Sequence, residues 1–72
     1  MAAGDVLKIV RTAQGKSLRV LGKKARVHFT VLNRIERGLP ATHDQLRKIA
    51  RGLRVTEKNF HRAIALSNEP RD

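Results

Sequence analysis

Apolar residues recur along the chain at intervals of three or four, which is the spacing of a helix with one buried face. The first run contains Val6, Leu7 and Val10, with Asp5 near its start and Gly15 just beyond its end. It predicts a helix over residues 4–14. Alternation of the kind that indicates a strand is never sustained, so the pattern predicts an all-α domain.

Two short helices are expected next, joined by a tight connection. Ser17 is a candidate N-cap for a helix that ends near Lys24. A third helix is predicted over residues 28–37, because Gly38 and Pro40 form a firm stop after it. Its apolar positions are Val31, Leu32 and Ile35.

Capping signals place two more helices in the second half of the chain. Thr42 precedes Gln45 by three residues, which is the spacing of a capping box. Thr56 is the corresponding cap of a fifth helix. The expected inward positions of these two helices are Leu46, Ile49, Ala50, Leu53, Phe60, Ala63 and Ile64. We expect one domain over residues 1–66 and a flexible C-terminal tail over residues 67–72.

Positive charge is concentrated in the middle of the chain. The formal net charge is +10, and eleven of the sixteen basic residues lie between Lys16 and Arg54 with only two acidic residues among them. A cationic region on a folded scaffold is expected of a protein that binds a polyanion. Solubility alone is the other explanation of such charge.

Residues suited to catalysis or metal binding are sparse. The three histidines, His28, His43 and His61, are far apart in sequence, and the chain has no cysteine. Neither a zinc site nor a nucleophile with a base is indicated. We therefore expect no enzyme activity, no metal and no cofactor.

No apolar run approaches the roughly 20 residues that a membrane-spanning helix needs, and no signal-type N-terminus is evident. The expectation is a soluble, intracellular protein.

Residues 17–24 and 28–37 together fit a helix-turn-helix, in which the second helix presents side chains to the major groove. The positive charge around them agrees with that interpretation. From these patterns alone, a basic amphipathic helix pair without DNA readout is an equal alternative.

The order of residues from Leu7 to Val55 resembles the phage-repressor and Cro-like, or XRE-type, helix-turn-helix domains. The segment "LNRIERG" followed by Pro40, and the segment "LRKIARGL" after it, carry most of the resemblance. The matching residues are Ser17, Leu21, Gly22 in the place of Ala, Val27, His28, Leu32, Ile35, Glu36, Gly38, Pro40, Leu46, Ile49, Ala50, Leu53 and Val55. The resemblance implies a compact five-helix, lambda-repressor-like fold.

It also implies a structural ion pair. Glu36 resembles the glutamate that pairs with an arginine of the first helix in such domains, and Arg11 stands at the matching position. A solvated Glu36 paired with Arg37 or nearby lysines is the alternative.

Outward positions of the third helix correspond to those that read bases in the family. They are Phe29, Thr30, Asn33 and Arg34. Arginine suits guanine, asparagine suits adenine, and an apolar group suits the thymine methyl. For Phe29, insertion into the core is an open alternative.

Phosphate contacts are expected from the residues that surround this helix. They are Lys16, Ser17, Arg19, Lys23, Lys24, Arg26, His28, Arg37 and His43. The chain departs from the family at Leu18, where a phosphate-binding glutamine is usual, and at Arg26, where the turn usually has glycine. Either the turn changes shape, or Arg26 adopts a left-handed conformation at a cost of roughly 1–2 kcal/mol.

The resemblance implies a sequence-specific double-stranded DNA-binding transcriptional regulator, expected to act as a repressor. It also implies a location in the cytoplasm of a bacterial or phage-infected cell. A homodimer is expected, with Ile64 and Leu66 as candidates for its contact surface. Two alternatives stay open. One is an antitoxin that represses its own operon and binds a toxin, and the other is an adaptor or nucleoid protein that does not read bases.

Overall fold

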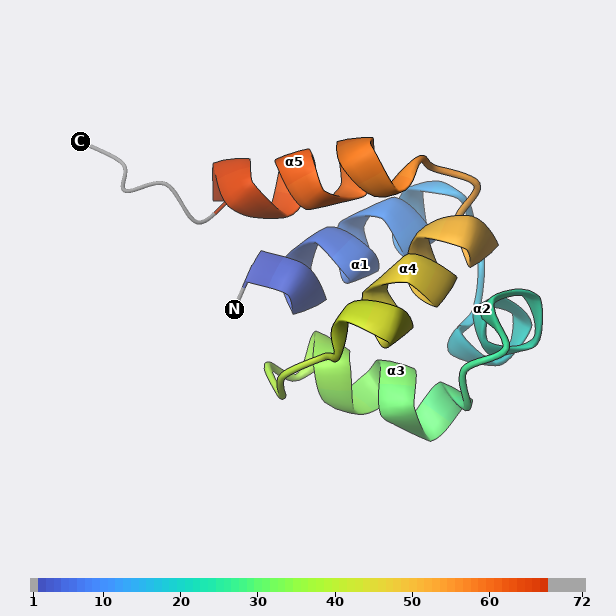
Figure 1. Cartoon of the computed structure of the whole chain (residues 1–72). Coiled ribbons are helices and arrows are strands. Elements are labelled where there is room, and N and C mark those ends of the chain that lie inside the picture. The colour runs from blue at the N-terminus through green and yellow to red at the C-terminus, as the bar shows by residue number, and fades with distance from the viewer. Residues whose placement is uncertain (1, 68–72) are drawn as a thin grey trace.

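Every regular element in the computed structural model, which describes residues 2–67, is an α-helix (Figure 1). The helices are α1 (Ala2–Ala13), α2 (Leu18–Ala25), α3 (Phe29–Glu36), α4 (His43–Gly52) and α5 (Glu57–Ser67). The predicted all-α fold with five helices is confirmed. The predicted bounds that can be compared differ from these by no more than two residues.

The caps that the sequence predicts begin three of the helices. Ser17 Oγ accepts the backbone N–H three residues further on, at 3.1 Å. Thr42 and Gln45 form a reciprocal capping box, with bonds of 2.9 and 3.0 Å. Thr56 Oγ1 accepts an N–H of α5 at 3.1 Å. Because each cap satisfies a donor that the helix itself cannot, these residues fix where the helices start.

The five helices pack around one core. In Figure 1, α1 and α5 lie side by side, α4 runs below them, and α3 lies on the side of α4 away from α5. Helix α2 packs against both α4 and α3. The pair α2 and α3 therefore rests on the other helices and leaves an outer surface free.

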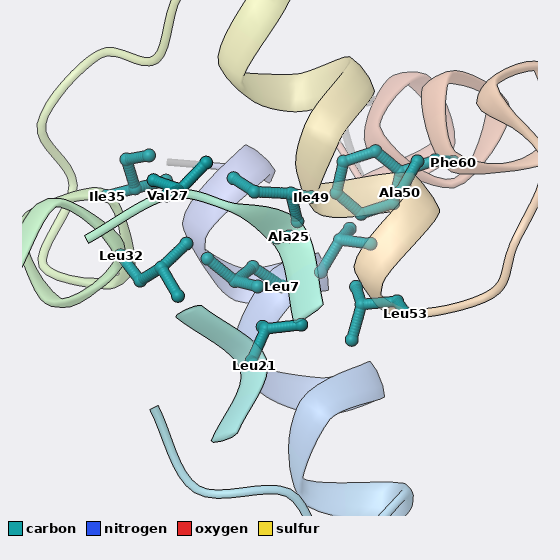
Figure 2. Packing of buried hydrophobic residues seen from close by; sticks show 11 residues of the cluster. Leu7, Leu21, Ala25, Val27, Leu32, Ile35, Ile49, Ala50, Leu53 and Phe60 are labelled. Atoms are coloured by element: carbon teal, nitrogen blue, oxygen red, sulfur yellow. The ribbon is translucent and has the colours of Figure 1, made fainter. Parts of the chain in front are cut away.

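Every helix contributes to the core (Figure 2). Leu7, Leu21, Leu32, Ile49 and Phe60 come from α1, α2, α3, α4 and α5 in turn, and all are buried. No buried residue among those described is polar or charged. Burial of such side chains contributes about 1.5–3 kcal/mol each, so the core holds α2 and α3 in a fixed relation.

Of the predicted tail, residues 67–72, only Ser67 is among the described residues, and it is the last residue of α5. Residues 68–72 lie outside the described residues. The division into a domain of residues 1–66 and a tail stays a prediction.

Candidate nucleic-acid interface

The turn between α2 and α3 is built on a left-handed residue. Arg26 has φ 57° and ψ 39°, and its backbone N–H bonds to Gly22 O. Val27 then turns into the core and is buried. Of the two possibilities left open by the sequence, the structure has the second, in which a non-glycine residue takes the left-handed conformation. The cost of that conformation is roughly 1–2 kcal/mol.

Close approach of backbone to α2 explains the glycine at position 22. A Cβ atom there would lie 2.8 Å from Val27 O and 3.3 Å from Phe29 N. Both contacts are tight, and the first would force a backbone shift. Gly22 therefore lets the turn and the first residue of α3 lie directly against α2.

His28 caps the N-terminus of α3. Its Nδ1 accepts the backbone N–H of Thr30 at 3.2 Å and lies 2.7 Å from Thr30 Oγ1. A backbone N–H can only donate, so Nδ1 carries no hydrogen in this arrangement. The ring hydrogen is then on Nε2.

One side of helix α3 is buried and another side is exposed. Leu32 and Ile35 are buried in the core. Thr30, Asn33 and Arg34 are exposed. Apolar residues three or four positions apart thus lie on the side of α3 that packs on the core, and the polar residues between them face solvent.

Phe29 lies between these two sides. Its ring is half-buried and is not part of the core cluster. The Arg19 guanidinium carbon lies 4.4 Å from its centroid, and the His28 ring stacks on it at 4.7 Å with an angle of 26°. The core alternative is thereby set aside, although base contact by Phe29 stays a prediction. Sequence periodicity gives no signal for the Arg19 contact, because the two residues belong to different helices.

Glu36 pairs with Arg11 of α1. Arg11 Nε donates to Glu36 Oε2 at 2.7 Å and Nη2 donates to Oε1 at 3.0 Å, while Nη1 donates to Lys16 O at 2.9 Å. The side chains are 16% and 8% exposed. The hydrogen bonds that Arg11 donates to the Glu36 carboxylate raise the pKa of Arg11 above its ordinary value. A bidentate pair of this kind joins the C-terminal end of α3 to α1 and to the loop before α2.

Most of the residues expected to contact phosphate are exposed around α2 and α3. The exposed ones are Ser17, Arg19, Lys23, Lys24, Arg26, His28, Arg37 and His43. Within residues 2–67, none of the lysines and arginines among them takes part in a salt bridge, so no carboxylate neutralises their charges. The cations of α2 and the turn lie next to the start of α3.

Lys16 is placed differently. Its ammonium group donates to Gln14 Oε1 at 2.6 Å and to Gly52 O at 3.2 Å. Gln14 in turn donates to Leu53 O at 2.7 Å. The loop between α1 and α2 therefore supplies donors to the C-terminal carbonyls of α4, which is a favourable position for a cation. This contact joins residues 36 positions apart, and the sequence offered no signal for it.

His43 has a neighbour that the sequence did not indicate. Its ring stacks on that of His61, at 5.3 Å between centroids and 10° between planes, and so connects the start of α4 to α5. On the outer side of α4, Asp44 accepts hydrogen bonds from Arg47 and Lys48. The bond from Arg47 is the main reason why the pKa of Asp44 lies below its ordinary value. In the described part of the chain, no three His, Cys, Asp or Glu residues gather as metal ligands.

None of the described helices has the length and apolar character needed to cross a membrane. Among curated proteins, no sequence matches the chain.

The crystal structure of the clp gene regulator ClgR from C. glutamicum is similar to this fold. Its TM-score is 0.84 at 25% sequence identity, and the match covers 97% of this chain and 92% of that one. The family profile described as helix-turn-helix matches residues 7–60, which include α2, the turn and α3. The chain therefore belongs to the helix-turn-helix family, in its XRE-type branch, and is a DNA-binding transcriptional regulator.

Proposed function

We propose that this regulator reads a specific sequence of double-stranded DNA by placing α3 in the major groove. The observation that carries the proposal is the division of α3, whose buried Leu32 and Ile35 leave Thr30, Asn33 and Arg34 exposed together. A guanidinium can donate two bonds to guanine, and an asparagine amide can pair with adenine. The Thr30 methyl group suits thymine.

The surrounding cations and caps are proposed to hold the DNA backbone. These proposed phosphate contacts are Ser17, Arg19, Lys23, Lys24, Arg26, His28, Arg37 and His43. Such contacts fix register and orientation but carry no sequence information. Lys16 would reach a phosphate only by leaving Gln14 and Gly52. We therefore propose that Lys16 stabilises the C-terminus of α4 instead.

A homodimer that represses by occupying its operator is the proposed mode of action. Leu66 is 59% exposed at the end of α5, and Ile9 is 67% exposed on α1, the neighbouring helix. Ile64 is half-buried against the core, so Leu66 is the more available of the two residues expected at the dimer contact. Two copies related by a two-fold axis would bind half-sites about one helical turn apart.

The proposal includes no catalytic step and no cofactor. We place the protein in the cytoplasm, with the DNA on which such a regulator acts. A toxin as a second partner stays an alternative. Use of the fold without base readout is another alternative, and the following experiment addresses it.

The test is selection of bound duplexes from a random DNA pool, followed by affinity measurements on the selected site and on a scrambled one. Arg34→Ala should weaken binding to the selected site by about 1–3 kcal/mol. It should also reduce the difference in affinity between the selected and the scrambled duplex. Lys23→Ala is the matched control, because it should weaken both duplexes by the same factor. A pool that yields no preferred sequence would refute base readout, and a palindromic product would support the dimer.

A further inference from the structure

Phe29 is the first residue of α3, and its ring joins the two helices of the motif. Arg19 comes from α2, and its guanidinium carbon lies 4.4 Å from the Phe29 centroid. The His28 ring, directly before α3, stacks on Phe29 at 4.7 Å. A cation over an aromatic ring is attracted by the ring's negative face. We call these three side chains the Arg19–Phe29–His28 stack.

The stack presents donors and no acceptor of its own. Nδ1 of His28 accepts from Thr30, so the ring hydrogen is on Nε2, which makes no hydrogen bond within residues 2–67. The guanidinium of Arg19 likewise makes no salt bridge in that range. Both groups are therefore available to an external acceptor.

An open hollow of about 430 Å³ lies beside the stack, at the turn of the motif. Four of its lining residues carry a positive charge or an N–H donor, and no acidic residue in the described part of the chain lines it. Those four are Arg19, Lys23, Arg26 and His28. Its other lining residues, Gly22, Val27 and Phe29, supply backbone and an apolar ring. This chemistry suits the anionic oxygens of a phosphodiester.

We propose that the Arg19–Phe29–His28 stack is a preformed seat for a phosphodiester of the DNA backbone, in which Arg19 and His28 Nε2 donate and Phe29 is a positioning residue. A free arginine side chain has to be ordered when it binds, and that ordering weakens association. Phe29 holds the guanidinium in place before DNA arrives. The seat replaces the phosphate contact that Leu18 does not supply. This inference rests on the proposed placement of α3 on DNA, and it changes the expected role of Phe29 from reading a base to positioning Arg19.

A double-mutant cycle tests the positioning role, with a short random-sequence duplex at low salt as the probe and fluorescence anisotropy as the readout. Arg19→Ala should weaken binding about tenfold in the wild-type background and threefold or less in the Phe29→Leu background. Lys23→Ala is the matched control, because Lys23 has no ring beneath it and should lose the same factor in both backgrounds. Equal losses for Arg19→Ala in the two backgrounds would overturn the proposal.

The salt dependence separates positioning from direct contact. Arg19→Ala should lower the slope of log affinity against log salt by about 1, whereas Phe29→Leu should lower the affinity and leave the slope unchanged. Phe29→Tyr, which keeps the ring, should behave as wild type. A change of slope on Phe29→Leu would contradict the assigned role.

Two variants keep the proposal testable if Phe29→Leu fails to fold. Arg19→Lys preserves the charge but loses the planar group over the ring, so it should bind several-fold more weakly with the slope retained. His28→Asn preserves an N-cap and removes the Nε2 donor, so it should weaken binding with little change in melting temperature. Wild-type affinity in both variants would refute the seat. Failure of the wild-type protein to bind any duplex would instead refute the proposed function.

Discussion

Replacement of Arg26 by glycine should raise the stability of the fold and weaken DNA binding. Its left-handed backbone, with φ 57°, costs an L-residue roughly 1–2 kcal/mol. Glycine avoids that cost but loses about 0.5–1 kcal/mol through the greater freedom of the unfolded chain. The difference between these two ranges is about 0–1.5 kcal/mol. Arg26→Gly should therefore stabilise the fold by up to about 1.5 kcal/mol and raise the melting temperature of a domain of this size by up to about 12 °C.

Arg54→Gly is a matched control for this change. Arg54 is the other non-glycine residue with positive φ among residues 2–67, at 59°, and it lies in the connection between α4 and α5, away from α3 (Figure 1). Both variants relieve the same backbone strain and remove one positive charge. Only Arg26→Gly removes a proposed phosphate contact, so only that variant should lower the salt slope of DNA binding, by about 1.

Thermal unfolding followed by circular dichroism, and anisotropy titrations at several salt concentrations, measure the two effects. A lower melting temperature for Arg26→Gly would show that the left-handed backbone of Arg26 does not destabilise the fold. Equal salt slopes for Arg26→Gly and Arg54→Gly would show that Arg26 does not contact the DNA backbone. Either result would refute the reasoning that links this turn to its function.

Three further changes test the packing and the charges of the domain. Glu36→Gln should lower the free energy of unfolding in urea by about 1–3 kcal/mol, because Arg11 is left partly buried without its charged partner. A loss of stability no larger than that of a surface ion pair would contradict this prediction. Gly22→Ala should lower the melting temperature, because overpacking by a Cβ atom 2.8 Å from Val27 O destabilises the fold by about 1–3 kcal/mol. An unchanged or higher melting temperature would show that the turn can move to make room for the added methyl group. Asp44 has a pKa below its usual value of 3.8, so its contribution to stability is present above that pH and is lost as the pH falls through the lower folded value. Asp44→Asn should thus be less stable than wild type at neutral pH, with the difference closing in acid, and a constant difference down to about pH 2 would contradict the assignment.

The fold was predictable because its signals are local. Gly38 and the capping box of Thr42 and Gln45 act within one turn of the helix they end or begin. Leu32 and Ile35 lie three residues apart on one side of α3, and both are buried as that spacing predicts. Each of these features depends on neighbours in sequence, so the chain itself contains the information.

Contacts between helices were predictable only where a family pattern supplied them. The pair of Arg11 and Glu36 was expected from the resemblance, and the structure contains it. The bond of Lys16 to Gly52 and the placement of Arg19 over Phe29 join residues of different elements. No periodicity or local motif encodes such contacts, because they depend on how helices cross.

Entry of α3 into the major groove is the central claim, and methylation protection on the selected duplex tests it most directly. Dimethyl sulfate modifies guanine N7 in the major groove and adenine N3 in the minor groove. Bound protein should protect guanine N7 within the site, and Arg34→Ala should restore reactivity at one guanine per half-site. Protection confined to adenine N3 would contradict the account.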